Sequence, residues 1–443
     1  SLANGSGAAS NYSLGAIEID VTQRVINLDG IRSFDGTSSI SGSDIQTFGN
    51  IVSGDTLVLS GTGSVPNANA EMNKSLSLGT LTLGDGNTSA SNYTLSGGSH
   101  TYDISQLSVN VTGSKIYDGS TTVNGSILSL TNLVSGETVS LTGSGSIDSA
   151  AVGANKTVNS GTLALTGSGS GNYTLSSYTT TFEVLPRPIS LSGSRQYNGT
   201  ASADNSDLTM SNLVSGESLN LSGAGTVLSA AVGSNKAISS GSLSLTNGSG
   251  TATNYTLIGG TLELTITPRQ LTLSGTRVYD GTNNASNADL TNIANLVGSE
   301  TLTLGGTGTV ASASVGSNKN VTLNNLALVS GTGVSSNYSI NSASLTISKR
   351  PVSIDGTRTY DGTTNATASD LTTMSNLVTG ETLSLSGTGS VGSAAVGNDK
   401  SITIGTLSLS DGSGESDNLY FNWRYINTRR NKKRYNSKWN PII

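Results

Sequence analysis

A lysine and two carboxylates recur together along the chain, and their types could support a covalent cross-link. The lysine ends a Gly-x-Asn-Lys motif, which reads Gly-Asn-Asp-Lys at Lys400; the first carboxylate belongs to an aromatic-Asp-Gly motif, and the second ends a Leu-Val-x-x-Glu motif. A buried neutral amine can attack a carboxyl group while a second carboxylate carries the proton, which would give an isopeptide bond. The candidate triads are Lys156 with Asp118 and Glu137, Lys319 with Asp280 and Glu300, and Lys400 with Asp361 and Glu381.

The same residues also fit ordinary structural roles. Asp-Gly is a strong turn signal, because Gly adopts positive φ readily and the Asp side chain can bond the backbone two residues on. The ring before it is then expected to anchor the turn in the core. An acid and a base kept in each copy also suggest an exposed salt bridge, which would contribute about 0–1 kcal/mol. Intact mass separates the two interpretations, since a cross-link removes one molecule of ammonia or water.

No other group of residues indicates catalysis or a cofactor. The chain has no cysteine, which excludes disulfides and thiolate metal sites, and its single histidine, His100, has no repeated partner. Asp280 with Asp289, or Asp361 with Asp370, could offer oxygen ligands to calcium, but the second copy has Ser126 at the matching position of the second acid. We therefore predict no enzymatic activity, no cofactor and no bound metal.

The element that must position these residues is a tandem repeat of about eighty residues. The ring of the aromatic-Asp-Gly motif stands at positions 34, 117, 197, 279 and 360, with spacings of 83, 80, 82 and 81 residues. The predicted units are 1–22, the C-terminal part of a truncated repeat; 23–105, 106–186, 187–268 and 269–349, four complete repeats; 350–418, an incomplete fifth repeat; and 419–443, a basic aromatic tail.

Within a repeat, period-two alternation predicts β-strands. In the unit 269–349, residues 270–274, 301–304 and 344–347 alternate apolar and polar side chains, and 292–296 is the one candidate for a short helical turn. Short strands separated by Gly, Asn and Ser clusters predict an all-β fold, a small antiparallel, Ig-like β-sandwich. A parallel β-solenoid is the competing fold, but it requires a shorter internal period than the sequence contains.

Proline and arginine mark the boundaries between the predicted repeats. The pairs are Pro186 with Arg187, Pro268 with Arg269, and Pro351 with Arg350. Proline interrupts a strand ladder and stiffens the chain, and the connections between repeats have almost no length. We therefore expect neighbouring repeats to form a semi-rigid rod.

The motifs in combination resemble the YDG repeat family. A further motif, Asn-Tyr-Thr or Asn-Tyr-Ser, carries a ring expected to pack at the start of the final strands, at Tyr12, Tyr93, Tyr173, Tyr255 and Tyr338. The resemblance covers residues 1 to about 414, with Phe34, Asn198 and Asp55 as departures from Tyr, Asp and Glu. Such domains occur in large bacterial surface-exposed and filamentous-haemagglutinin-like adhesins, so the resemblance implies an extracellular stalk or adhesin without enzymatic activity.

Residues 419–443 differ from the repeats. They hold Trp423, Trp439 and seven of the 22 basic residues with no acid, which leaves 15 basic against 28 acidic residues elsewhere, a net charge of −13. Deleting one base after the Asn418 codon can restore Asn-Tyr-Thr-Leu-Thr-Gly-Gly, so we interpret the tail as a frameshift product and not as a nucleic-acid or membrane-binding segment. The fifth repeat then lacks its last strands, and residues 11–22 are such strands without a sheet. Head-to-tail self-association by strand donation is a further hypothesis.

Composition favours a structural role outside the cell. A cysteine-free, acidic array rich in Thr, Ser and Asn suits a secreted bacterial surface protein, and no apolar run reaches the roughly 20 residues of a membrane span. We predict a stalk that holds a distant adhesive tip away from the cell. The alternative is that the repeats themselves bind glycans or proteins of a host, a matrix or another cell.

Overall fold

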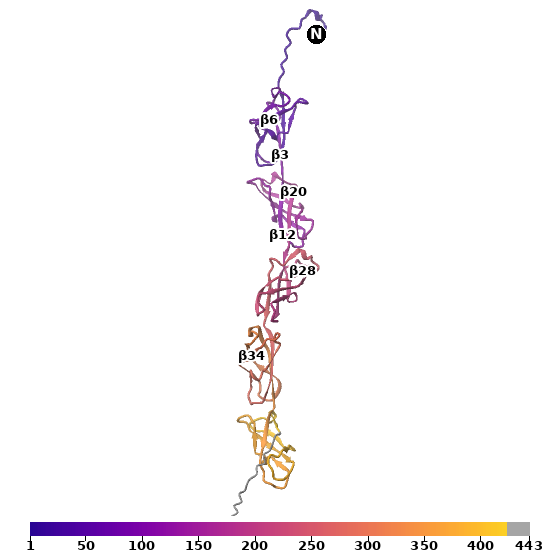
Figure 1. Cartoon of the computed structure of the whole chain (residues 1–443). Coiled ribbons are helices and arrows are strands. Elements are labelled where there is room, and N and C mark those ends of the chain that lie inside the picture. Colours follow the sequence, from indigo (N-terminus) through magenta and orange to yellow (C-terminus); the bar gives the residue numbers. More distant parts are fainter. Residues whose placement is uncertain (423–443) are drawn as a thin grey trace, which may run out of the picture. The chain divides into compact units, whose positions relative to one another are not determined.

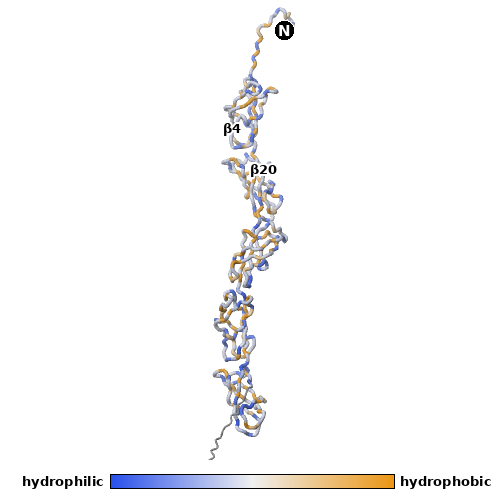
Figure 2. Tube along the Cα trace, viewed as in Figure 1, coloured by the Kyte–Doolittle hydropathy of each residue, from blue (hydrophilic) through white to orange (hydrophobic). Residues whose placement is uncertain are grey.

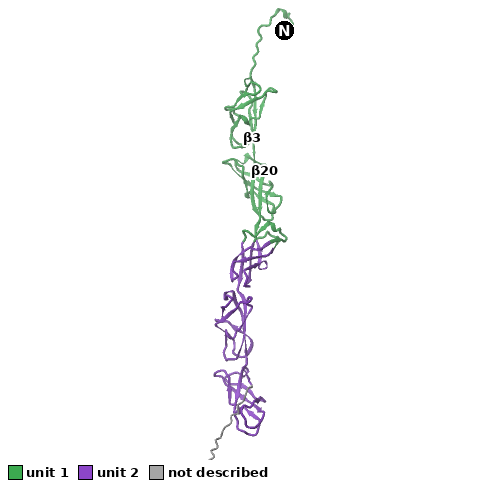
Figure 3. Ribbon diagram, in the orientation of Figure 1, with its two compact units in different colours: residues 1–189, 212–220, 245–260 green, residues 190–211, 221–244, 261–443 purple. Residues whose placement is uncertain are grey.

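The computed structural model describes residues 1–422, and in this part of the chain the regular elements are β-strands and three-residue 3₁₀ turns. Two compact units are distinguished (Figure 3). The first contains residues 1–189, 212–220 and 245–260, and the second contains 190–211, 221–244 and the chain from 261 on. The division passes through the predicted third repeat, so each junction between consecutive repeats lies inside a single unit.

The fourth repeat shows the architecture most completely. Its large sheet has the strand order β32-β35-β36-β38-β31-β33. These strands are β32 (Asn284–Ser286), β35 (Thr307–Val310), β36 (Gly316–Thr322), β38 (Tyr338–Ser348), β31 (Arg269–Val278) and β33 (Asn292–Ala294). A second sheet pairs β34 (Leu302–Gly305) with β37 (Ala327–Ser330) in antiparallel fashion. The alternating segments predicted from the sequence fall within β31, β34 and β38, apart from residue 301, which precedes β34, so the strand prediction is confirmed there.

The third repeat has the same large sheet in the order β23-β26-β27-β30-β22-β24, within the second unit. Its strands are β23 (Ser202–Asp204), β26 (Ala224–Val227), β27 (Gly233–Ser239), β30 (Leu262–Thr267), β22 (Ser190–Gln196) and β24 (Leu208–Ser211). In the fifth repeat the described sheets are smaller. They comprise β41 (Thr373–Ser375), β39 (Arg350–Asp355) and β46 (Leu419–Phe421), then β40 (Asn365–Thr367), β43 (Thr388–Val391) and β44 (Ile402–Thr403), then β42 (Leu383–Ser386) and β45 (Ser408–Asp411).

The first and last strands of a repeat pair in parallel, which corrects the expectation of a purely antiparallel sandwich. β31 runs parallel to β38 from Arg269 opposite Tyr338 to Val278 opposite Ser348. In the second repeat β12 (Leu107–Ile116) pairs in the same way with β20 (Tyr173–Leu185), as labelled in Figure 1. In the first repeat β3 (Ile31–Ser33) is parallel to β11 (Thr101–Ser105). A first and a last strand that run in one direction bring the chain in at one end of the repeat and out at the other.

The candidate helical turn at residues 292–296 does not form. Residues 292–294 form β33, which pairs with β31 through Leu273 opposite Ile293. Asn295 then adopts φ +77°, which ends the strand. The spacing of apolar residues in this segment resembles one turn of helix. A single helical turn is unstable by itself, and the backbone hydrogen bonds to the neighbouring strand β31 stabilise a strand instead.

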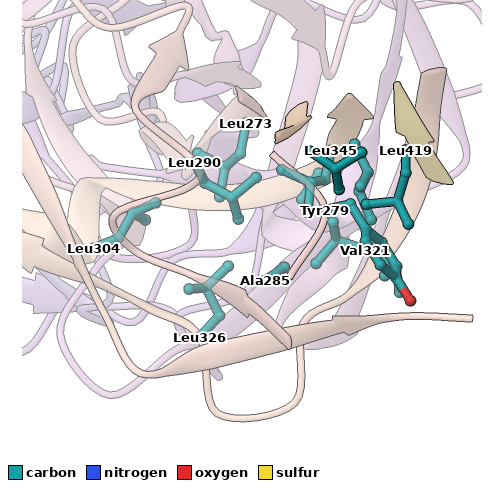
Figure 4. Close-up of a cluster of buried hydrophobic side chains, with 13 residues drawn as sticks. Leu273, Tyr279, Ala285, Leu290, Leu304, Val321, Leu326, Leu345 and Leu419 are labelled. Atoms are coloured by element: carbon teal, nitrogen blue, oxygen red, sulfur yellow. The ribbon is translucent and has the colours of Figure 1, made fainter. Parts of the chain in front are cut away.

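Each repeat buries one face of its strands. Hydrophilic and hydrophobic residues are interspersed along the chain in Figure 2, and buried and exposed positions alternate along β31 and β38. The apolar side chains of Leu273, Leu345 and Ile347 have 0–1% exposure. Each such side chain contributes about 1.5–3 kcal/mol through burial. The same cluster continues into the fifth repeat through Val352 and Leu419, and Leu419 lies near Tyr279 and Leu345 in Figure 4. The core of one repeat is therefore continuous with residues at the start and end of the next.

Candidate functional site at the repeat junctions

The aromatic-Asp-Gly motif forms the predicted turn. In the fourth repeat Asp280 Oδ1 accepts a hydrogen bond from the Thr282 N–H at 2.9 Å, and Gly281 has φ +77°. Arg277 closes the turn by donating to Asp280 at 3.1 Å and to the Thr282 carbonyl. The same backbone bond, from Thr363 N–H, holds the pKa of Asp361 below its usual value in the fifth repeat. The turn prediction is confirmed.

The ring before each turn reaches into the next repeat. The hydroxyl groups of Tyr117, Tyr197 and Tyr279 donate to carboxylates of the following repeat. These bonds join Tyr117 to Glu217 at 2.5 Å, Tyr197 to Glu300 at 2.6 Å and Tyr279 to Glu381 at 2.6 Å. The three rings are only 5–6% exposed. The glutamate of the Leu-Val-x-x-Glu motif is therefore a partner for the preceding repeat.

A second tyrosine completes the site from within the following repeat. Tyr338 donates to the other oxygen of Glu300 at 2.5 Å, and its ring packs edge-on against Tyr197 with centroids 5.4 Å apart. Tyr255 does the same for Glu217 at 2.6 Å. Burial, followed by the bond to the carboxylate, raises the pKa of Tyr338 and Tyr255 to about 12. One carboxylate is thus held between tyrosines from two repeats, in the neutral-tyrosine state.

Two further contacts accompany each glutamate. A Cβ placed on Gly281 would lie 2.9 Å from Val378 Cγ1 of the next repeat, so this close approach requires glycine. The Val315 N–H donates to Asn418 Oδ1 at 2.7 Å, and Asn418 is only 2% exposed. Equivalent N–H bonds at the other junctions join Ala70 to Asn172, Val152 to Asn254 and Val232 to Asn337, at 2.9, 2.9 and 3.0 Å.

The arginine that opens a repeat binds backward and forward. Arg269 donates to the backbone carbonyl of Tyr197 in the preceding repeat at 3.5 Å, and to Asn295 of its own repeat at 2.6 Å. Arg187 and Arg350 make the corresponding bonds. The boundary arginines therefore fasten one repeat to the next, beside the prolines.

The predicted Lys–Asp–Glu triads are not assembled, and the predicted lysine–glutamate ion pairs are absent among residues 1–422. Lys319 Nζ donates to the Ser314 carbonyl at 2.5 Å, and Lys400 donates to the carbonyls of Ser393 and Ala395. The acids of the turn pair with bases of their own motif instead. These ion pairs are Asp118 with Lys115 at 2.9 Å, Asp280 with Arg277 at 3.1 Å and Asp361 with Arg358 at 3.0 Å.

The triads do not assemble because the Asp and the Glu of one repeat lie at opposite ends of that repeat. The Asp of a repeat lies in the turn that faces the following repeat, whereas its Glu faces the preceding one; in the fourth repeat Tyr279 contacts Glu381 and Glu300 contacts Tyr197. The two acids therefore cannot share one lysine. The two acids of the fourth repeat considered as calcium ligands form ion pairs with an arginine instead. Arg277 Nη1 lies 3.1 Å from Asp280 Oδ2 and 4.0 Å from Asp289 Oδ2.

Two junctions depart from the common pattern. At the first, Phe34 packs edge-on on Tyr173 with centroids 5.5 Å apart but has no hydroxyl to offer Glu137. At the fourth, Leu419 replaces the second tyrosine, and the buried Glu381 Oε2 has no hydrogen-bond partner among the described residues. An orphaned buried carboxylate oxygen marks a position that fits tyrosine better than leucine.

The tail was expected to begin at residue 419, but β46 places Leu419–Phe421 in the fifth repeat, where it pairs in parallel with Arg350–Val352 of β39. The remainder of the predicted tail and its frameshift interpretation fall on residues 423–443, outside the described residues. Among residues 1–422, no helix is long and apolar enough to cross a membrane.

The fold and the junctions show that this protein is a tandem array of all-β domains. Residues of the repeated motifs join each domain to the next. The sequence model of the YDG domain matches residues 22–102, 104–181, 185–263, 261–347 and 343–422. The chain therefore belongs to the YDG domain family. No curated protein matches it.

Proposed function

We propose that this array is the stalk region of a secreted bacterial surface adhesin, which spaces a binding tip from the cell without enzymatic activity. The proposal rests on the contacts that the repeated motif residues make. Side chains that recur in the repeats, above all the tyrosines and the glutamate, contact the neighbouring repeat instead of lining a pocket. Repeated residues that fix the orientation of neighbouring domains suit a segment that acts as a spacer.

Direct connections support the same role. β38 ends at Ser348 and β39 begins at Arg350, so one residue separates two repeats. A short connection that is also braced by buried hydrogen bonds limits the swing of one domain against the next. The result would be a semi-rigid spacer on the extracellular side, whose length grows with the number of repeats.

Deletion of one repeat tests the spacer role. β31 has ten residues, which corresponds to a length of about 33 Å for one repeat. Removing residues 269–349 joins Tyr197 to Glu381, so the junction keeps its residue types. The maximum dimension from small-angle X-ray scattering should fall by about 33 Å. A flexible chain of domains would shorten much less, which would contradict a stiff spacer.

Binding by the repeats themselves is the alternative outcome. A glycan array probed with the full chain should stay blank if the repeats only space the tip. Saturable binding that survives deletion of any one repeat would favour adhesive modules instead.

A further inference from the structure

The first and last strands of a repeat connect to the neighbouring repeats at opposite ends of one ladder. In the fourth repeat, β31 begins at Arg269 and β38 ends at Ser348. Arg269 lies opposite Tyr338 and Val278 lies opposite Ser348 in the parallel pairing of these two strands. The chain therefore enters the ladder at one end and leaves it at the other.

Tension along the chain loads this ladder in shear. The preceding repeat would pull on Arg269 and the following repeat on Ser348, in opposite directions along the two strands. The hydrogen bonds run between the strands, across that direction, so β31 and β38 can separate only by sliding past each other. The ladder bonds then share the load and break together. A pull across the strands from one end would instead break them one pair after another.

The neighbouring strands and the core protect the ladder from water. In the sheet order β32-β35-β36-β38-β31-β33, the pair β38 and β31 lies between β36 and β33. The side chains of Leu273, Leu345 and Ile347 on these two strands have 0–1% exposure. Sliding of the strands would draw these side chains out of the core and expose apolar surface, which adds to the resistance.

The second and third repeats contain the same kind of ladder. It joins Asn110–Ile116 of β12 to Thr179–Leu185 of β20 in the second repeat. In the third repeat it joins Leu191–Gln196 of β22 to Leu262–Thr267 of β30. Both ladders are parallel, so tension along the chain loads them in the same direction as the ladder of the fourth repeat.

We propose that the second, third and fourth repeats are mechanical clamps, which resist unfolding when tension acts along the chain. The ladder between the first and last strands of each repeat is the load-bearing element. The proposal goes beyond the spacer role, because spacing depends on the orientation of one repeat against the next, whereas the clamp acts inside one repeat. A scattering result that contradicts a stiff spacer would therefore leave the clamp unaffected.

Forced unfolding of the fourth repeat in two directions tests the clamp. The chain has no cysteine, so two introduced cysteines can attach the full chain to DNA handles in optical tweezers. Gln270→Cys with Lys349→Cys loads the ladder in shear. Gln270→Cys with Asn341→Cys pulls the starts of β31 and β38 apart, across the strands. All three positions are exposed, and Asn341 lies at the shift in register between the two strands.

The direction of the load should decide the unfolding force. At one loading rate the force should be several-fold higher in shear than across the strands, because forced unfolding follows the unfolding rate and shear breaks the ladder as a unit. Complete unfolding in shear should lengthen the chain by about 250 Å. Both chains should melt at the same temperature without load, which assigns the difference to the direction of pulling. Equal forces in the two directions, or a lower force in shear, would overturn the proposal.

The first repeat offers a natural comparison with a shorter ladder. Its first and last strands pair in parallel only at Arg24–Val25, at Ile31–Ser33 and at one isolated bridge between these segments. Thr22→Cys with Gln106→Cys, both at exposed positions, loads this ladder in shear. The first repeat should unfold at a lower force than the fourth at the same loading rate. An equal or higher force would contradict the ladder as the load-bearing element.

Discussion

A disulfide engineered across the fourth junction should form and stabilise the array, because Val378→Cys removes the Cγ1 that a Cβ on Gly281 would meet at 2.9 Å. A Cβ on Gly281 lies 3.8 Å from Val378 Cβ, and disulfides have Cβ separations of about 3.5–4.5 Å. The bond would close a loop of about 97 residues (378 minus 281), for which the chain-entropy estimate is about 4.7 kcal/mol. Gly281 has φ +77°, so cysteine there costs about 1–2 kcal/mol. The expected net gain is about 3 kcal/mol.

Thiol titration reads the result directly, because the unmodified chain contributes no cysteine. After mild oxidation the double variant Gly281→Cys with Val378→Cys should contain no free thiol, and reduction should lower its melting temperature. Gly362→Cys with Val378→Cys is the control, since Gly362 has φ +79° in the same type of turn but no neighbour within 4 Å. At low protein concentration the control should keep both thiols. Two free thiols in the Gly281 variant would refute the junction geometry.

Three further predictions concern the tyrosine–carboxylate contacts. Leu419→Tyr should supply the missing donor to the buried Glu381 Oε2 and stabilise the fourth junction by about 1–2 kcal/mol, measured as a higher melting temperature in calorimetry; no change would mean that water already satisfies this oxygen. Phe34→Tyr should add the bond to Glu137 that the first junction lacks, with a gain of about 1 kcal/mol by the same measurement, and a loss of stability would show that the hydroxyl has no room there. The pKa of Tyr338 is raised to about 12 from 10.0, so the stabilisation is complete below pH 10 and lost as the pH rises toward 12. Tyrosinate absorbance should therefore show this tyrosine ionising late, and Glu300→Gln should make it ionise earlier.

Much of the single repeat was predictable from the sequence. The spacing of the rings gave the unit length, and alternation located strands such as β31 and β34. The Asp-Gly turn followed from glycine's freedom at positive φ, as at Gly281. These features depend on residues close together in the chain, where sequence patterns are informative.

The junction was not predictable in the same way. A residue type present in each copy is equally consistent with a contact inside its repeat and with a contact to the next repeat. Glu300 could therefore be assigned to Lys319 as easily as to Tyr197, its actual partner from the preceding repeat. The direction of strand pairing was hidden for a similar reason, because alternation is the same in parallel and antiparallel strands. The one available signal was the near absence of linkers, which forces neighbouring repeats into contact.

The distance between adjacent repeats in solution tests the junction most directly. Spin labels on Thr303→Cys in β34 and Ser384→Cys in β42 would report on the fourth and fifth repeats from exposed positions. Pulsed electron resonance should give one narrow distance distribution, which broadens when Glu381→Ala removes the partner of Tyr279. A broad distribution in the chain with intact Glu381 would contradict the account, because the motif residues would then not hold neighbouring repeats in a fixed orientation.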